Sequence, residues 1–226
     1  MPSTARTFPY EAVIFDMDGV IVDTEAFYQK EERAFADYLG VEVSDAEILD
    51  MVGKSHQHFV QTVTRWLTLA GQEGLTGAEA EARYRAWSAD RSRDYRSMMF
   101  PGIHEALDGL HRRGTRVALA SSSPRASILA VLDQLGIADA FELVVSGAEL
   151  RESKPNPAIY LLTLEQLGLP AAACCCIEDS VPGITAGKRA GLTAFARREE
   201  RFGFSRAKAD AILDRVDDIL KVTERV

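Results

Sequence analysis

Residues 12–20 have the sequence AVIFDMDGV, in which an uninterrupted apolar run, Ala12 to Phe15, leads directly into Asp16 and Asp18. An apolar run without polar alternation is typical of a strand that is covered on both faces of its sheet. Five more such runs follow, mostly separated by helix-like segments: residues 116–120, 143–145, 174–177, 193–195 and 211–213. This alternation predicts βαβ units. We therefore expect an α/β fold whose core is a doubly wound, mostly parallel, Rossmann-like sheet.

Residues 24–97 interrupt the alternation, because they contain helical patterns and no convincing strand. Residues 44–47 have the sequence SDAE, which fits a helix capping box. A later group has spacings compatible with one helix face: Phe59, Val63, Trp66, Leu67 and Leu69. We therefore expect an α/β core domain of residues 1–23 and 98–226, with an all-helical domain of residues 24–97 inserted into it.

The residues that follow four of the apolar runs carry groups suited to binding phosphate or a metal ion. They are Asp16 and Asp18, then Ser121 to Ser123, then Lys154, then Glu178 and Asp179. Each has an ordinary structural explanation on its own: an acidic turn, a surface lysine, or Ser123 as a helix cap before Pro124. In an open α/β sheet, however, ligands bind beyond the carboxyl ends of the strands. Together, the four groups predict one site at that edge.

The first two acidic residues of this set favour a magnesium site. Asp16 and Asp18 follow one strand closely, and two crowded carboxylates repel each other unless a cation is present. Mg²⁺ prefers oxygen ligands and commonly binds one or two carboxylates together with a substrate phosphate. We therefore expect these residues to form a metal and phosphate centre.

With these motifs in this order, the chain resembles the haloacid dehalogenase-like hydrolases, in the branch of β-phosphoglucomutase-like proteins and sugar-phosphate phosphatases that have a helical cap. Residues 16–20 (DMDGV) resemble the first motif of the family, Ser121 the second, Lys154 the third, and Glu178 with Asp179 the fourth. The resemblance covers almost the whole chain, and the helical insertion lies where this branch has its cap.

The resemblance implies a magnesium-dependent phosphatase that acts on a small phosphorylated metabolite, such as a sugar phosphate. Asp16 would attack phosphorus and form an aspartyl-phosphate, while Asp18 would protonate the leaving oxygen and later deprotonate water. Ser121 and the Ser122 backbone would bind the phosphoryl oxygens. Lys154 would offset the charge of the phosphate and the nucleophile.

The resemblance also implies a set of metal ligands and a role for the cap. Mg²⁺ would be bound by four residues: the Asp16 side chain, the Asp18 carbonyl oxygen, Asp179, and Glu178 through water. The cap would close over the substrate and select the leaving group. Residues 53–56 (GKSH) resemble the substrate-specificity loop, which makes Lys54 and His56 candidate substrate contacts.

Two alternative functions stay open. The first is a β-phosphoglucomutase-like mutase, which would return the phosphoryl group to a sugar. Tyr28 and His56 favour the phosphatase, because the mutases have histidine and arginine at these positions. The second is a non-catalytic protein that binds phosphorylated metabolites, which the presence of both Asp16 and Asp18 disfavours.

Asp18 also favours phosphate esters as substrates, since haloacid dehalogenases have no acid at this position and phosphonate-cleaving members have a small residue there.

The composition narrows the range of partners. The net charge of -8 disfavours binding to the phosphate backbone of nucleic acids, so the expected partner is a small phosphate ester. No apolar run is long enough for a membrane span or a signal peptide, which predicts a cytoplasmic protein.

The three cysteines, Cys174 to Cys176, are consecutive and are expected to be buried strand residues. The sequence does not indicate an oligomeric state.

Overall fold

The computed structural model of the protein describes residues 8–52, 56–89, 93–203 and 205–226. The chain divides into two compact units. Met1–Asp23 and Tyr95–Val226 form the first, which we call the α/β unit, and Thr24–Asp94 forms the second, which we call the helical unit. No helix of the described residues is both long enough and apolar enough to cross a membrane.

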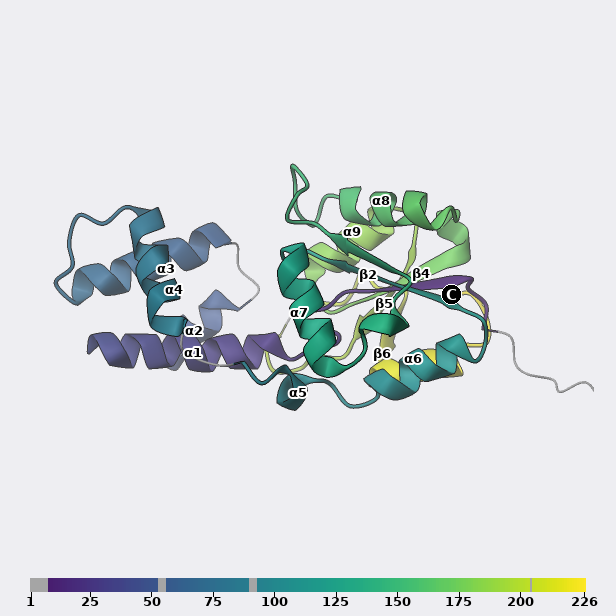
Figure 1. The fold of residues 1–226 in the computed structure, drawn as a ribbon, viewed down its shortest axis with the longest axis horizontal. Coiled ribbons are helices and arrows are strands. Elements are labelled where there is room, and N and C mark those ends of the chain that lie inside the picture. The colour runs from purple at the N-terminus through teal and green to yellow at the C-terminus, as the bar shows by residue number, and fades with distance from the viewer. Residues whose placement is uncertain (1–7, 53–55, 90–92, 204) are drawn as a thin grey trace, which may run out of the picture. The chain divides into compact units, whose positions relative to one another are not determined.

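The α/β unit contains a six-stranded sheet in the order β3-β2-β1-β4-β5-β6 (Figure 1). All neighbouring strands are parallel. The strands are β1 (Ala12–Phe15), β2 (Arg116–Ser121), β3 (Leu143–Ser146), β4 (Cys174–Glu178), β5 (Thr193–Arg197) and β6 (Ala211–Leu213). The doubly wound parallel sheet predicted from the apolar runs is therefore confirmed.

Four of the strands extend beyond the predicted apolar runs, β2, β3 and β4 by one residue and β5 by two. β2 ends at Ser121, which pairs with Ser146, and β4 ends at Glu178, which pairs with Ala196. The apolar pattern stops earlier because a polar residue at the end of a strand can still pair with its neighbour. Ser121 and Glu178 therefore belong to the sheet itself.

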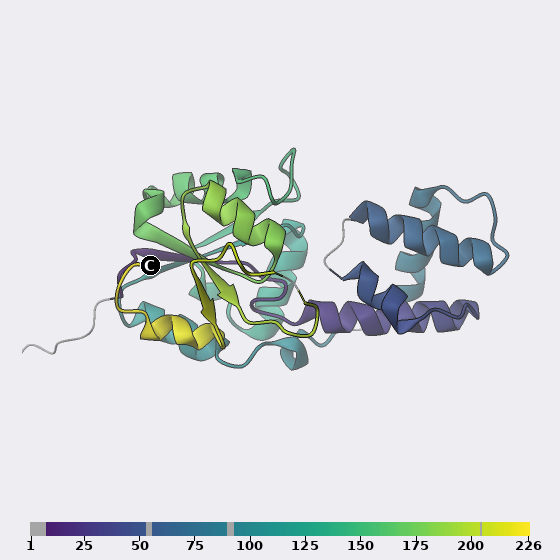
Figure 2. The same ribbon diagram turned by 180° about the vertical axis from the view of Figure 1, so that it is seen from behind.

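Helices cover both faces of the sheet, as the front and back views show (Figure 1, Figure 2). One face packs against α8 (Ala158–Leu167) and α9 (Val181–Arg189), and the other against α6 (Ile103–His111) and α7 (Arg125–Leu135). The remaining elements of this unit are α5 (Tyr95–Met98), η1 (Ala138–Ala140), η2 (Ala171–Ala173) and η3 (Val216–Lys221). The three cysteines of β4 are fully buried, as predicted.

The strand order places the end of β1 at the centre of the sheet. Phe15 of β1 is level with Leu119 of β2 on one side and with Ile177 of β4 on the other. The chain winds from β1 through β2 to β3 in one direction and from β4 to β6 in the other. Asp16 therefore follows β1 at the topological switch point, where open α/β sheets bind their ligands.

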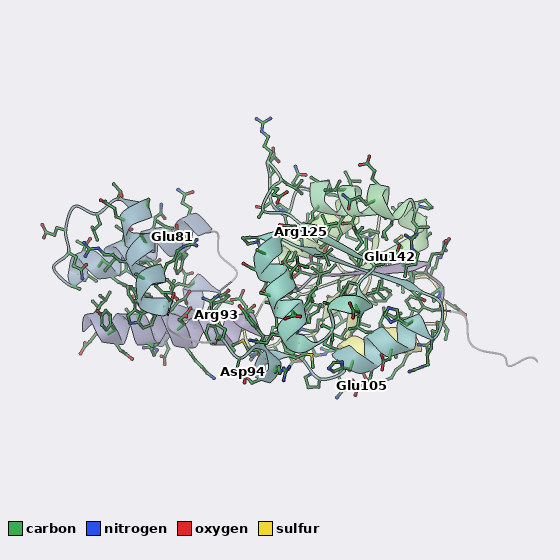
Figure 3. All side chains as sticks on the ribbon, viewed as in Figure 1. Glu81, Arg93, Asp94, Glu105, Arg125 and Glu142 are labelled. Atoms are coloured by element: carbon green, nitrogen blue, oxygen red, sulfur yellow. The ribbon has the colours of Figure 1, made fainter. Side chains whose placement is uncertain are left out.

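The described part of the helical unit consists of α1 (Thr24–Leu39), α2 (Asp45–Met51), α3 (His56–Leu69) and α4 (Gly77–Ser88). Its apolar core includes Phe35, Trp66 and Tyr84. The Tyr84 hydroxyl donates to the buried carboxylate of Glu31 at 3.0 Å, and Arg93, labelled in Figure 3, donates to the same oxygen at 3.4 Å. This unit therefore has a core of its own.

Two local predictions for the helical unit are wrong in part. Leu69 does not belong to the buried face of α3, because it lies at the helix end and is 62% exposed. The capping box at residues 44–47 is only half formed. Ser44 Oγ accepts from the Glu47 N–H at 3.2 Å, but the Glu47 carboxylate accepts from Trp66 Nε1 at 2.5 Å. A complete capping box, Thr76 with Glu79, begins α4 instead.

Candidate active site

Asp16, the first residue after β1, lies at the centre of the candidate site. Its backbone N–H donates to the carbonyl oxygen of Ile177 in β4 at 3.0 Å, which fixes the residue against this strand. Its side chain is nearly buried, and Oδ1 accepts a hydrogen bond from Lys154 Nζ at 2.7 Å. The structure thus brings together two of the predicted site residues that are far apart in the sequence.

The Lys154 ammonium group is held by three acceptors. Besides Asp16, Nζ donates to Glu178 Oε1 at 2.6 Å and to the Ala120 carbonyl oxygen at 3.2 Å. Burial alone would lower the pKa of Lys154, but the two carboxylates outweigh burial and raise the pKa well above its ordinary value. The lysine is therefore a fixed, buried cation and not a solvated surface charge.

The carboxylates around Asp16 outnumber this cation. Burial raises the pKa of Asp16 well above its ordinary value, and Glu178 and Asp179 reinforce the effect while Lys154 opposes it. Asp16, Glu178 and Asp179 each offer a carboxylate oxygen, and these oxygens all lie within 4.8 Å of one another. Such a donor set fits Mg²⁺, which would offset the excess negative charge.

Glu178 is fully buried at the end of β4 and has several hydrogen-bond donors around it. In addition to Lys154, the hydroxyl of Tyr160 donates to Oε1, and Ser180 Oγ donates to Oε2 at 3.4 Å. Gly183 gives the carboxylate its space, since a Cβ at this position would lie 1.9 Å from Oε2. Glu178 thus fixes Lys154 beside Asp16, a role additional to its predicted one as a metal ligand.

Asp179 is packed against the turn that carries the acidic pair. A Cβ at Gly19 would lie 2.0 Å from Asp179 Oδ2, and the backbone of Gly19 has a φ of +78°. Residues with a side chain rarely adopt this conformation. Glycine is therefore required here both for its backbone and for the close approach of Asp179.

The three serines after β2 have different environments. Ser121 is buried, and its Oγ accepts from the N–H of Ser123 at 3.2 Å, whereas Ser122 is exposed. The ordinary structural explanation of Ser123 as a helix cap does not hold, because Pro124 is the N-cap residue of α7. Instead, Ser123 Oγ donates to Asp18 Oδ2 at 3.2 Å. The segment after β2 therefore contacts Asp18, the second acid of the first motif.

Sequence reasoning did not identify two residues of the site, Tyr160 and Ser123, in these roles. The apolar spacing of α8 predicts a buried aromatic residue at Tyr160, but the partner of its hydroxyl depends on the packing of α8 against β4. Lys54 lies outside the described residues, as does the side chain of His56.

Comparison with known proteins identifies the family. The model of the haloacid dehalogenase-like hydrolases matches residues 10–191. Hexitol phosphatase B of Escherichia coli O157:H7 is 30% identical over 210 residues, or 90% of this chain and 93% of that protein. Beta-phosphoglucomutase of Bacillus subtilis (strain 168) is 31% identical over 193 residues, or 81% of each chain. The crystal structure of CbbY from Rhodobacter sphaeroides in complex with phosphate has a TM-score of 0.69 at 26% identity, covering 93% of this chain and 96% of that one. The chain therefore belongs to the haloacid dehalogenase-like hydrolases.

Proposed function

We propose that this protein hydrolyses a small phosphorylated metabolite in a magnesium-dependent reaction, through an aspartyl-phosphate on Asp16. It is a phosphoric monoester hydrolase, in agreement with the family model and with the phosphatases among its relatives. The observation that carries the proposal is the contact of Lys154 Nζ with Asp16 Oδ1 at 2.7 Å, in an acidic cluster at the switch point of the sheet. A carboxylate paired with a buried cation at this place is suited to attack a phosphate dianion.

The reaction would proceed in two displacements at phosphorus. In the first, a carboxylate oxygen of Asp16 forms a bond to phosphorus, the bond to the leaving oxygen breaks, and Asp18 donates a proton to that oxygen. In the second, Asp18 accepts a proton from water as the water oxygen attacks phosphorus. Inorganic phosphate leaves, and the Asp16 carboxylate is restored.

The groups around the nucleophile would bind and neutralise the phosphoryl group. The Ser121 hydroxyl and the Ser122 backbone N–H would donate to its oxygens, and Lys154 would offset their charge. The Asp16 side chain, the Asp18 carbonyl oxygen, Asp179 and Glu178 would hold Mg²⁺. When bound, the ion supplies positive charge against the phosphoryl oxygens during transfer.

We propose a phosphorylated sugar or polyol as the substrate. Support comes from the relatives named hexitol phosphatase B and, at 31% identity, phosphorylated carbohydrates phosphatase of Thermotoga maritima. The similarity to beta-phosphoglucomutase makes a mutase the second candidate. To separate the two, the enzyme is incubated with glucose 1-phosphate and a bisphosphate activator. Glucose 6-phosphate formed without free phosphate would contradict the phosphatase, and release of phosphate from a panel of sugar and polyol phosphates would identify its substrate.

Asp16→Asn tests the nucleophile directly. We expect this variant to lose release of phosphate from p-nitrophenyl phosphate by about 10³-fold or more, because the amide cannot form the acyl phosphate. Chelation of Mg²⁺ with EDTA should abolish the wild-type activity, and added Mg²⁺ should restore it. Asp108→Asn, at an exposed position on α6, is the matched control and should be fully active. Equal rates for Asp16→Asn and the wild type would refute the assignment.

A further inference from the structure

Arg197 is the last residue of β5 and takes no part in the chemistry described above. Its guanidinium group nevertheless lies beside the segment that directly follows Asp18. The residue is 7% exposed, and Nε donates to the carbonyl oxygen of Gly19, which follows Asp18 in the chain. Its two other nitrogens donate to the Arg198 carbonyl oxygen at 2.8 Å and to Glu199 Oε2 at 3.0 Å. All three nitrogens of the buried group are therefore engaged.

Glu199 connects this arginine to a second one. Its carboxylate accepts from Arg197 and from Nε of Arg201 at 2.8 Å. Arg201 also forms a bidentate ion pair with Asp23, with N···O distances of 2.7 and 3.0 Å. Burial alone would raise the pKa of Glu199, but hydrogen bonds from Arg201 and Arg197 outweigh it and lower the pKa to about 2. The network is thus charged at neutral pH.

The two arginines hold opposite ends of one turn, residues 19–23, which directly follows Asp18. Inside the turn, the Gly19 N–H donates to the Val22 carbonyl oxygen at 2.8 Å, and Val22 also forms a β-bridge with Asp18. Arg197 reaches the first residue of the turn and Arg201 reaches the last. The end of β5 and the connection that follows it therefore fix the position of the turn.

A proton donor must lie within hydrogen-bond reach of the atom that it protonates, and a small displacement reduces the rate strongly. Removing one partner of a buried ion pair leaves an uncompensated charge, so loss of either arginine should disturb the contacts that hold the turn. We propose that Arg197 and Arg201 are positioning residues, which hold the turn after Asp18 so that Asp18 can protonate the leaving oxygen. This inference rests on the proposed function.

The test compares two substrates that differ in their need for a proton. p-Nitrophenolate leaves readily as an anion, whereas phenolate is a poorer leaving group and depends more on an acid. We expect Arg197→Lys and Arg201→Ala to lower kcat/KM for phenyl phosphate about tenfold more than for p-nitrophenyl phosphate. Asp18→Asn should show the same selective loss. Arg198→Ala is the matched control, because this side chain pairs with Asp214 at 2.5 Å and is half exposed.

The outcomes separate the inference from the function on which it rests. A purely structural role would lower both kcat/KM values by the same factor, and that result in an active background would overturn the positioning role alone. A wild-type enzyme that hydrolyses neither substrate would overturn the proposed function as well. Thermal unfolding monitors the fold of each variant. If Arg197→Lys does not fold, Arg201→Ala decides, since Arg201 is close to half exposed.

Discussion

Among single residues, the glycines beside the acidic cluster show how closely the site is packed. Gly19 and Gly183 leave space for the carboxylates of Asp179 and Glu178, respectively. Tyr160 adds a hydroxyl donor to Glu178, at the same carboxylate oxygen that accepts from Lys154. The geometry around Asp16 thus depends on residues that carry no charge, and substitutions at these positions test it.

Gly19→Ala should impair both activity and stability, because the new methyl group must displace Asp179 and the backbone has a positive φ. Gly136→Ala is the matched control. Gly136 has a similar φ of +70°, but nothing lies within 4 Å of the position of its Cβ. We expect the control to lose about 1 kcal/mol of unfolding free energy and to keep full activity. Urea unfolding and kcat with p-nitrophenyl phosphate measure both effects, and equal kcat values for the two variants would contradict the close packing.

Tyr160→Phe should lower kcat several-fold, because Glu178 loses one donor and holds Lys154 less firmly. Loss of the hydrogen bond should also lower the free energy of unfolding by about 1–2 kcal/mol. Tyr10→Phe offers a comparison at the other end of β1, where the Tyr10 hydroxyl bonds to Thr193 at 3.2 Å. This control should lose similar stability and retain full kcat. A Tyr160→Phe enzyme with wild-type kcat would show that the hydroxyl serves stability alone.

Among the elements, α1 carries an unusual feature of the helical unit, a buried acid near other acids. Glu32 is 7% exposed. Burial, and then the neighbouring carboxylates of Glu25 and Glu31, raise its pKa from 4.5 to about 8. The folded chain therefore keeps a proton on Glu32 that the unfolded chain releases at lower pH. The contribution of Glu32 to stability is therefore fully present below the unfolded pKa and is lost as the pH rises toward 8.

Glu32→Gln should remove this dependence on pH, because the amide stays neutral. We expect the variant to match the wild type near pH 4.5 and to exceed its unfolding free energy by about 4 kcal/mol at pH 8.5. Thermal unfolding followed by circular dichroism across this range measures the difference, in which titrating groups that do not interact with Glu32 cancel between the two proteins. Asp37→Asn, at an exposed position on the same helix, should show no such trend. A constant difference between Glu32→Gln and the wild type would refute the shifted pKa.

The elements also show what can be derived from the sequence. All six strands follow from apolar runs, since strands covered on both faces need no polar alternation. Parallel strands then bring Asp16, Lys154 and Asp179 to one edge, so their proximity is predictable. The hydrogen-bond partners of Ser123 and Arg197 are not predictable. A serine before a proline has the sequence pattern of a helix cap, and an arginine at a strand end has the pattern of a surface charge. Their contacts depend on side-chain packing between distant segments.

At the scale of the whole molecule, the chain consists of two units that have separate apolar cores. The chain leaves the α/β unit after Asp23 and returns at Tyr95. The segments of the α/β unit on either side of the insertion lie next to each other. The Asp23 N–H donates to the Met98 carbonyl oxygen at 2.8 Å, and Val22 forms an antiparallel bridge with Met99. A short connection can therefore close the α/β unit without the insertion.

Replacing residues 24–94 with a short glycine-serine linker should leave a folded α/β unit. We expect a cooperative thermal transition and retained Mg²⁺-dependent hydrolysis of p-nitrophenyl phosphate. We propose that the helical unit excludes water during the reaction, so its removal should lower kcat/KM by about tenfold or more. The separate helical unit, residues 24–94, should show helical circular dichroism and no activity. Absence of a cooperative transition in the shortened chain would contradict the independence of the two cores.

The buried cysteines of β4 have a practical consequence for spectroscopy. Cys174, Cys175 and Cys176 are the only cysteines of the chain, and all three are fully buried. Burial raises the pKa of each thiol, that of Cys174 to about 11, and keeps these groups from reacting with maleimide dyes. The native cysteines should therefore remain unlabelled, so that a cysteine introduced at the surface is labelled selectively. Asp37→Cys on α1 combined with Glu165→Cys on α8, both at exposed positions, would accept a donor and an acceptor dye. A change in energy transfer when substrate is added would test the expected closure of the helical unit over the substrate.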